Sequence, residues 1–123
     1  MKQIKTMMLL LMATIAFTAA KAQDTKTDTF KVWGNCGMCK KTIEKAAKSD
    51  GVEKAEWNRE TKVFTLVYNP AVISNEKIQK AIAAAGYDTE KFTGDNKAYE
   101  KLPGCCHYDR KKKDETNNSN HQH

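Results

Sequence analysis

Two cysteines separated by two residues, Cys36 and Cys39, are the side chains in this sequence that are best suited to chemistry. An alternating apolar run with Phe30 and Val32 precedes them, and a helical pattern follows, so the pair is expected at a strand-to-helix turn. The free N–H groups and the dipole at a helix start favour ionisation of a thiol there. Because a thiolate is both a metal ligand and a nucleophile, the motif predicts either a soft-metal site or a redox dithiol.

A second group of metal-capable side chains, Cys105, Cys106 and His107, lies near the C-terminus. These residues could complete a site of three or four ligands with Cys36 and Cys39, which would suit Zn(II) or a more tightly held copper ion. A vicinal or cross-linking disulfide and incidental thiols are the alternatives. Neither cysteine pair closes a long loop, so stapling the domain is not their main purpose.

Residues 1–22 predict a secretory signal peptide, with a basic start, an apolar run over 7–17 and a small-x-small sequence that ends at Ala22. Cleavage is expected between Ala22 and Gln23. The apolar run is short for a membrane span, so no stable membrane anchor is expected after cleavage. The sequence therefore predicts a periplasmic or secreted protein.

The formal net charge of the whole chain is +6. The predicted cleavage removes three lysines and no acidic residue, which leaves +3. The remaining basic residues are not interleaved with aromatic residues as in a nucleic-acid-binding surface. The sequence shows no paired catalytic carboxylates, phosphate-binding loop or Ser/His/Asp arrangement, so a protein without enzymatic activity is expected.

The periodicity of the apolar residues changes along the chain in a regular order. It predicts a strand over 29–33, a helix over 39–48, strands over 52–57 and 62–68, a helix over 75–85 and a strand over 87–92. The second helix is expected to bury Ile78, Ala81, Ile82 and Ala85. This order predicts an α+β, ferredoxin-like βαββαβ sandwich: a four-stranded antiparallel sheet with two helices on one face.

Four parts of the chain after the signal peptide are expected. They are a flexible leader over 23–27, the domain over 28–93, an extension with the Cys-Cys-His sequence over 94–109, and a disordered tail rich in charge and Asn over 110–123. The predicted last strand would end at the pole opposite Cys36 and Cys39. The extension would then have to travel back to reach them, partly as a short helix over 95–102.

Residues 28–92 resemble the heavy-metal-associated domain, a family of small copper chaperones, periplasmic mercury-binding proteins and ATPase metal-binding modules. The matching features are Gly34 with the Cys-x-x-Cys motif, the Gly51-Val52 pair, the Asn58 hairpin and Ala85-Gly86-Tyr87. The resemblance implies that Cys36 and Cys39 bind one soft ion, usually Cu(I), with Zn(II) or Hg(II) as alternatives. It also implies transfer to a partner's thiolates, such as those of a metal-transporting ATPase.

The sequence differs from the usual family pattern in the loop before Cys36. The family usually carries there a Met that is buried in the core, whereas this chain has Gly34. Met38, inside the motif, is either a packing residue or a thioether ligand. Lys40 and Lys41 either offset the negative charge of the thiolates or are solvated helix residues.

Two other interpretations of the motif stay open. The first is a thiol–disulfide oxidoreductase that uses the same two cysteines, although the expected element order fits a thioredoxin-like fold badly. The second is a structural or partner-binding module whose cysteines are oxidised. A metal-binding site that gains the C-terminal ligands would indicate sequestration or sensing rather than fast shuttling.

Overall fold

A computed structural model describes residues 24–111 of the chain. The predicted signal peptide and most of the predicted tail lie outside these residues. Along the chain the elements are β1 (Lys26–Lys31), α2 (Gly37–Ala47), β2 (Val52–Trp57), β3 (Val63–Tyr68), α3 (Asn75–Ala84), α4 (Asn96–Glu100) and the 3-10 turn η1 (Gly104–Cys106). None of the helices within 24–111 is long and apolar enough to cross a membrane.

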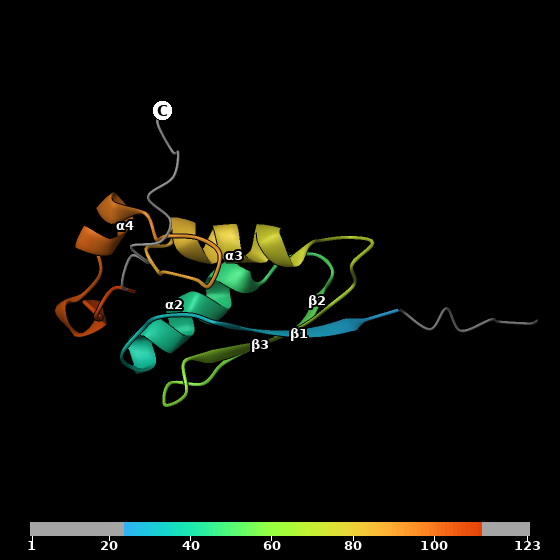
Figure 1. The fold of residues 1–123 in the computed structure, drawn as a ribbon, viewed down its shortest axis with the longest axis horizontal. Helices are drawn as coiled ribbons and strands as arrows, with labels where there is room; N and C mark the ends of the chain where they lie inside the picture. The colour runs from blue at the N-terminus through green and yellow to red at the C-terminus, as the bar shows by residue number, and fades with distance from the viewer. Residues whose placement is uncertain (1–23, 112–123) are drawn as a thin grey trace, which may run out of the picture.

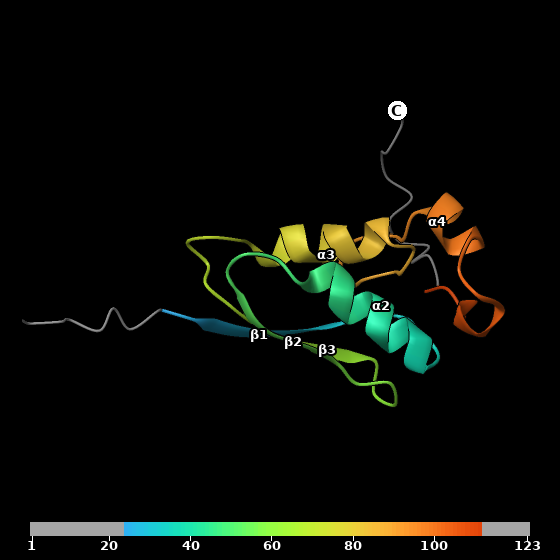
Figure 2. The same ribbon diagram turned by 180° about the vertical axis from the view of Figure 1, so that it is seen from behind.

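The sheet is antiparallel in the strand order β1-β3-β2. Helices α2 and α3 lie together on one face of it (Figures 1 and 2). Phe30 pairs with Phe64 in register, and their rings stack at 5.0 Å between centroids. The core lies between this face and the two helices, because Phe30 of β1 and the alternate residues Phe64, Leu66 and Tyr68 of β3 are buried. The residues between them are exposed or half-buried.

Local signals in the sequence explain where several elements begin and end. Asn58 accepts hydrogen bonds from the N–H groups of Glu60 and Thr61 in the hairpin between β2 and β3, as expected for an Asx turn. The Ser74 hydroxyl accepts from the Lys77 N–H and caps α3. Gly51 and Gly86 follow α2 and α3 with positive φ angles of 89° and 105°, which glycine adopts without strain.

The α+β, ferredoxin-like class is confirmed, but the expected fourth strand is not formed. Within residues 24–111 the sheet has three strands, and the segment expected as the last strand contributes one isolated bridge, between Val32 and Thr89. The Thr89 N–H donates to the Phe92 carbonyl at 2.8 Å, so the chain turns directly after the bridge. The segment carries one β-branched residue and three charged ones, which gives it little strand propensity.

This early turn keeps the following segment near the end of α3 instead of sending it to the opposite pole. Gly94 packs against the backbone of Gly86, where a Cβ atom would come within 2.8 Å, and the Asp95 N–H donates to the Ala83 carbonyl at 2.8 Å. The expected return path is therefore not needed. The segment also covers a different face of α3 from the expected one, so Ala83 is buried whereas Ala81 is exposed.

The C-terminal extension packs at the end of the molecule where α2 begins (Figures 1 and 2). The Asp95 side chain accepts from the Ala98 N–H and caps α4, which confirms the short helix expected in this segment. After α4 and Pro103, the turn η1 carries the second cysteine pair.

Candidate metal site

The first turn of α2 positions the Cys-x-x-Cys motif. Cys36 is the N-cap residue, in an extended conformation, and its carbonyl accepts the helical hydrogen bond from the Lys40 N–H at 3.1 Å. Cys39 lies one turn further and is fully buried, whereas Cys36 is half-buried. Their sulfurs are 3.6 Å apart, and both thiols are free. The motif thus presents one sulfur toward the surface and one inside the domain.

The loop before Cys36 has room only for glycine at position 34. A Cβ atom on Gly34 would lie 2.9 Å from the ring of Trp57 and 3.0 Å from Ile43. The indole N–H of Trp57 donates to the Val32 carbonyl at 3.0 Å, which fixes the ring beneath the loop. Trp57 therefore fills the space under the loop, and this accounts for a Gly, instead of a Met, at position 34.

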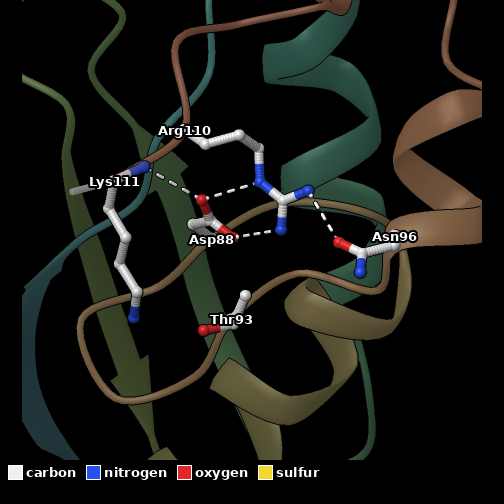
Figure 3. A pocket seen from close by; sticks show the side chains of 5 residues that line it. All are labelled: Asp88, Thr93, Asn96, Arg110 and Lys111. Carbon is white, nitrogen blue, oxygen red and sulfur yellow. Dashed lines mark hydrogen bonds and ion pairs between the residues drawn. The ribbon is translucent and has the colours of Figure 1, made fainter. Parts of the chain in front are cut away.

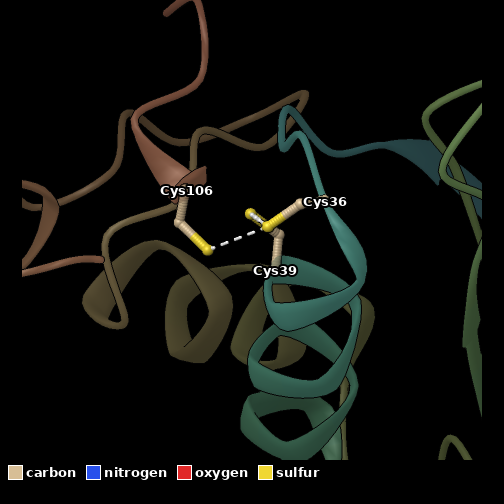
Figure 4. A group of neighbouring side chains, drawn as sticks. All are labelled: Cys36, Cys39 and Cys106. Carbon is tan, nitrogen blue, oxygen red and sulfur yellow. Dashed lines mark hydrogen bonds between the residues drawn. The ribbon is translucent and has the colours of Figure 1, made fainter. Parts of the chain in front are cut away.

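The turn η1 brings the second cysteine pair to the first, and Figure 4 shows Cys106 beside Cys36 and Cys39. The sulfur of Cys36 is 3.1 Å from that of Cys105 and 3.4 Å from that of Cys106. The sulfurs of Cys36, Cys39 and Cys106 all lie within 4.8 Å of one another. Cys106 is buried like Cys39, whereas Cys105 is exposed.

Three thiols at these separations fit a single soft ion. Thiolate sulfurs that bind one ion at about 2.3 Å lie roughly 3.8–4.0 Å apart. The distances from the Cys36 sulfur to those of Cys39 and Cys106, 3.6 Å and 3.4 Å, need to increase by only a few tenths of an ångström. Thiolate sulfur is the donor that Cu(I) and other soft ions prefer.

The electrostatic environment makes Cys36 the first thiol to ionise. The main cause is the backbone N–H of Cys39, which lowers the pKa of Cys36 to about 6. The Cys36 side chain lies near this N–H but does not form a full capping hydrogen bond with α2. The neutral Cys36 thiol donates to Cys105; after ionisation that direction reverses, and the thiols of Cys105 and Cys106 lower the pKa further. Burial, above all, raises the pKa of Cys106. The metal-free site therefore carries its negative charge mainly on Cys36.

Tyr87 lies beside the buried sulfurs. Its hydroxyl is buried and has no hydrogen-bond partner among the described residues. Burial raises the pKa of Tyr87, and the nearby Cys39 and Cys106 raise it further. A neutral phenol in this position can donate to a thiolate once a metal ion has replaced the protons of the buried thiols.

Tyr108 fixes the chain just after Cys106. Its hydroxyl donates to the Gly86 carbonyl at 2.6 Å and accepts from the Asp88 N–H at 2.8 Å. Its ring stacks on Tyr87 at 5.6 Å between centroids and meets Tyr99 edge-on at 5.1 Å. Tyr108 thereby joins the extension to the residues that follow α3.

A buried ion pair completes the attachment (Figure 3). Arg110 donates to both carboxylate oxygens of Asp88, at 2.9 Å and 2.8 Å, and also to the Gly94 carbonyl. Burial would raise the pKa of Asp88, but hydrogen bonds from Arg110 and from the N–H groups of Gly94 and Lys111 outweigh it and lower the pKa. A cavity of about 270 Å³ opens beside these residues. The sequence predicted that the disordered tail begins at Arg110, whereas the structure packs Arg110 and Lys111 against the domain.

Of the residues that the sequence singled out, the structure brings all four cysteines together and separates His107 from them. The His107 ring is exposed and stacks on Tyr99 at 5.2 Å. Lys40 binds Glu44 and the Trp57 carbonyl, which favours a structural role for it. Met38 is exposed and points its sulfur at Cys105.

Sequence reasoning missed the residues that hold the extension: Asp88, Tyr99, Tyr108 and Arg110. The alternation of Cys106, Tyr108 and Arg110 was the available signal, because every second residue of an extended segment faces the same side. All three contact the domain, whereas His107 and Asp109 between them are exposed.

Comparison with known proteins agrees with this geometry. The model of the heavy-metal-associated domain matches residues 29–88. The solved structure of the CopZ metallochaperone is 30% identical, with a TM-score of 0.50; the match covers 52% of this chain and 98% of that chain. This chain belongs to the heavy-metal-associated domain family.

Two other solved structures are also similar to this chain. Oxidized MerP from Ralstonia metallidurans CH34 is 37% identical, with 54% of this chain and 94% of that chain covered and a TM-score of 0.51. The N-terminal domain of a potential copper-translocating P-type ATPase from Bacillus subtilis, in the Cu(I)-loaded state, is 31% identical, with 53% and 84% covered and a TM-score of 0.51. No curated protein matches the chain.

The heavy-metal-associated domain of this chain is a soft-metal-binding module that acts through its cysteines. The matched residues end at 88, so the family model does not include the extension. The second cysteine pair is therefore a feature of this chain that the family model does not describe.

Proposed function

We propose that this protein binds one Cu(I) ion through Cys36, Cys39 and Cys106, outside the cytoplasm, and acts without enzymatic activity. The observation that carries the proposal is the position of Cys106, whose sulfur lies 3.4 Å from that of Cys36 in a cluster of three thiols, two of them buried. A family member with two thiolates would leave the ion open to an incoming ligand. A third, buried thiolate favours tighter holding and slower release.

The chemistry of the cluster favours Cu(I) over Zn(II). Zn(II) prefers four ligands in structural sites, whereas three soft sulfurs in a buried cluster suit Cu(I). The Cys105 sulfur lies 3.1 Å from that of Cys36 and 3.9 Å from that of Cys106, but it is not in the group whose sulfurs all lie within 4.8 Å of one another, because it is further from Cys39. Cys105 is also exposed, which makes it a poorer fourth ligand for the same ion. Hg(II) is also soft, and one similar structure is a MerP, so Hg(II) is the competitor that a measurement must address.

Export and delivery are further parts of this proposal. The basic start, apolar run and small-x-small sequence of residues 1–22 support secretion with cleavage after Ala22. A partner with exposed thiolates, such as a metal-transporting ATPase, would receive the ion by ligand exchange. The similarity to a domain of a potential copper-translocating ATPase supports this class of partner.

Titration of the reduced protein with Cu(I) against a competing chelator tests the proposal. Cys36→Ser/Cys39→Ser should abolish tight binding. Cys106→Ser should weaken the first equivalent by about tenfold or more, which corresponds to roughly 1.4 kcal/mol. Cys105→Ser is the matched control, because it removes an adjacent thiol while its hydroxyl can still donate to the Cys36 thiolate, so it should leave the first equivalent unchanged.

Each alternative has its own outcome. Full Cu(I) affinity in Cys36→Ser/Cys39→Ser would refute the site, and unchanged affinity in Cys106→Ser would reduce it to two ligands. Tighter binding of Hg(II) or Zn(II) in competition with Cu(I) would change the assigned metal. Reduction of insulin at a rate typical of oxidoreductases would favour the redox alternative.

A further inference from the structure

Two further sulfur donors, Cys105 and Met38, lie beside the cluster of three thiols and do not bind the proposed ion. The Cys105 thiol donates to the Met38 sulfur at 3.6 Å, and its own sulfur lies 3.1 Å from that of Cys36. Met38 is 52% exposed, although a methionine side chain is usually buried. The three sulfurs of Met38, Cys105 and Cys36 follow one another from the surface inward.

We propose that Met38, Cys105 and Cys36 form an outer Cu(I) position, which is filled after the inner position and shares Cys36 with it. This inference rests on the proposed function, because it assumes that Cys36, Cys39 and Cys106 bind the first ion. The outer position is where an ion enters or leaves the inner one.

The burial of the sulfurs supports this order. Cys39 and Cys106 are 0% and 1% exposed, so an ion reaches them past Cys36, the least buried of the three inner ligands. Met38 and Cys105 are both exposed and contact each other. A thioether is a soft, neutral donor that suits Cu(I) and adds no charge.

The charge balance also permits a second ion. A Cu(I) ion in the outer position replaces the proton of Cys105, which leaves to the solvent, so the net charge of the cluster does not change. The separation of 3.1 Å between the sulfurs of Cys36 and Cys105 must open to roughly 3.8–4.0 Å around an ion. Cys105 is exposed in the short turn η1, so few contacts resist this movement.

Native mass spectrometry and Cu(I) titration of the reduced protein, with Cu(I) alone as the probe, test this inference. The unaltered protein should bind two Cu(I) ions, the second more weakly than the first. Both Met38→Leu and Cys105→Ser should lose the second equivalent and keep the affinity of the first. Neither side chain is buried, so the variants are expected to fold.

A matched control tests position rather than sulfur content. Met38→Leu/Val72→Met moves the thioether to another exposed site, which contacts Gly51 beyond the far end of α2. This double variant should behave like Met38→Leu.

Two results would overturn the inference while the proposed function stands. One is a single Cu(I) ion bound at saturation to the unaltered protein. The other is a lower first affinity in Cys105→Ser together with no effect of Met38→Leu, which would make Cys105 a ligand of the inner ion. If no Cu(I) binds tightly to the unaltered protein, the proposed function itself fails, and this inference fails with it.

Discussion

Cys36 and Cys39 are held by regular secondary structure. Cys105 and Cys106 are held instead by the side-chain contacts of residues that follow them in the sequence. The first pair sits on the opening turn of α2, with the sheet and Trp57 beneath it. The second pair depends on Tyr108 and on the ion pair between Arg110 and Asp88. Each pair nevertheless contributes one buried sulfur and one that is more accessible.

Because the two pairs are held by different contacts, we expect that the two halves of the site can be lost separately. The first pair should persist as long as the domain folds. The position of Cys106 should depend on a few polar contacts, whose loss would release the extension from an otherwise intact domain. We therefore expect the ion pair to determine whether Cys106 is in place to act as a third ligand.

Arg110→Ala should have the largest effect. It leaves the buried Asp88 carboxylate without its cation, and breaking a buried pair costs about 3–5 kcal/mol, with the lower end expected here because Arg110 is partly exposed. Cu(I) affinity should fall to that of Cys106→Ser. Urea unfolding and Cu(I) titration measure the two effects.

Arg59→Ala is the control for this change, because Arg59 is exposed in the hairpin between β2 and β3. It should alter neither stability nor affinity. A Cu(I) affinity that stays at the level of the unaltered protein in Arg110→Ala would show that Cys106 is held without the ion pair.

Gly34→Ala should disturb the loop before the first cysteine pair and leave the second pair in place. Its Cβ would lie 2.9 Å from the Trp57 ring, so the loop or the ring must shift, at a cost of roughly 1–3 kcal/mol. Limited proteolysis should still find the extension protected, because its attachment to Asp88 is untouched. Gly37→Ala is the matched control, since a Cβ there meets no atom within 4 Å. Cleavage of the extension in Gly34→Ala would mean that the two halves are coupled.

The pH dependence of the metal-free, reduced protein should also separate the two halves. The pKa of Asp88 is lower in the folded state than its usual value of 3.8, so the unfolded state binds the proton more readily. The stability that Asp88 contributes is therefore complete above about pH 4 and is lost as the pH falls through the folded pKa. Asp88→Asn should lose this part of the acid dependence in urea unfolding between pH 2 and pH 5. An unchanged acid dependence in this variant would assign it to other carboxylates.

The sequence predicts the half of the site that regular structure positions. Alternation and helical spacing locate the strands and helices around Cys36 and Cys39, because burial of one face imposes that period. The same logic fails at the expected last strand, where Asp88 is buried not by a sheet but by Arg110, which lies far along the chain. Such a pair leaves no periodic signal in the residues around either partner.

The meeting of the two cysteine pairs was open at the level of the sequence, for a related reason. Whether Cys106 reaches Cys36 depends on where the chain turns after Thr89, and a turn closed by one side chain and one carbonyl is hard to predict from residue types. Gly34 is the opposite case. A glycine at this position indicates that another residue packs closely against the loop. The sequence alone does not identify that residue as Trp57.

Tyr87→Phe should have the smallest effect on folding and a selective effect on metal binding. In the metal-free protein the hydroxyl is buried without a partner, so its removal should leave stability unchanged or raise it slightly. In the metal-bound protein the same hydroxyl can donate to the thiolate of Cys106, and loss of such an outer hydrogen bond weakens metal binding by about tenfold. Urea unfolding without metal should therefore show no loss of stability, whereas Cu(I) titration should show weaker binding. Tyr99→Phe removes a hydroxyl that donates to the Tyr108 carbonyl, so it should lower stability instead. Equal Cu(I) affinity in Tyr87→Phe and the unaltered protein would show that the hydroxyl stays unpaired when the ion binds.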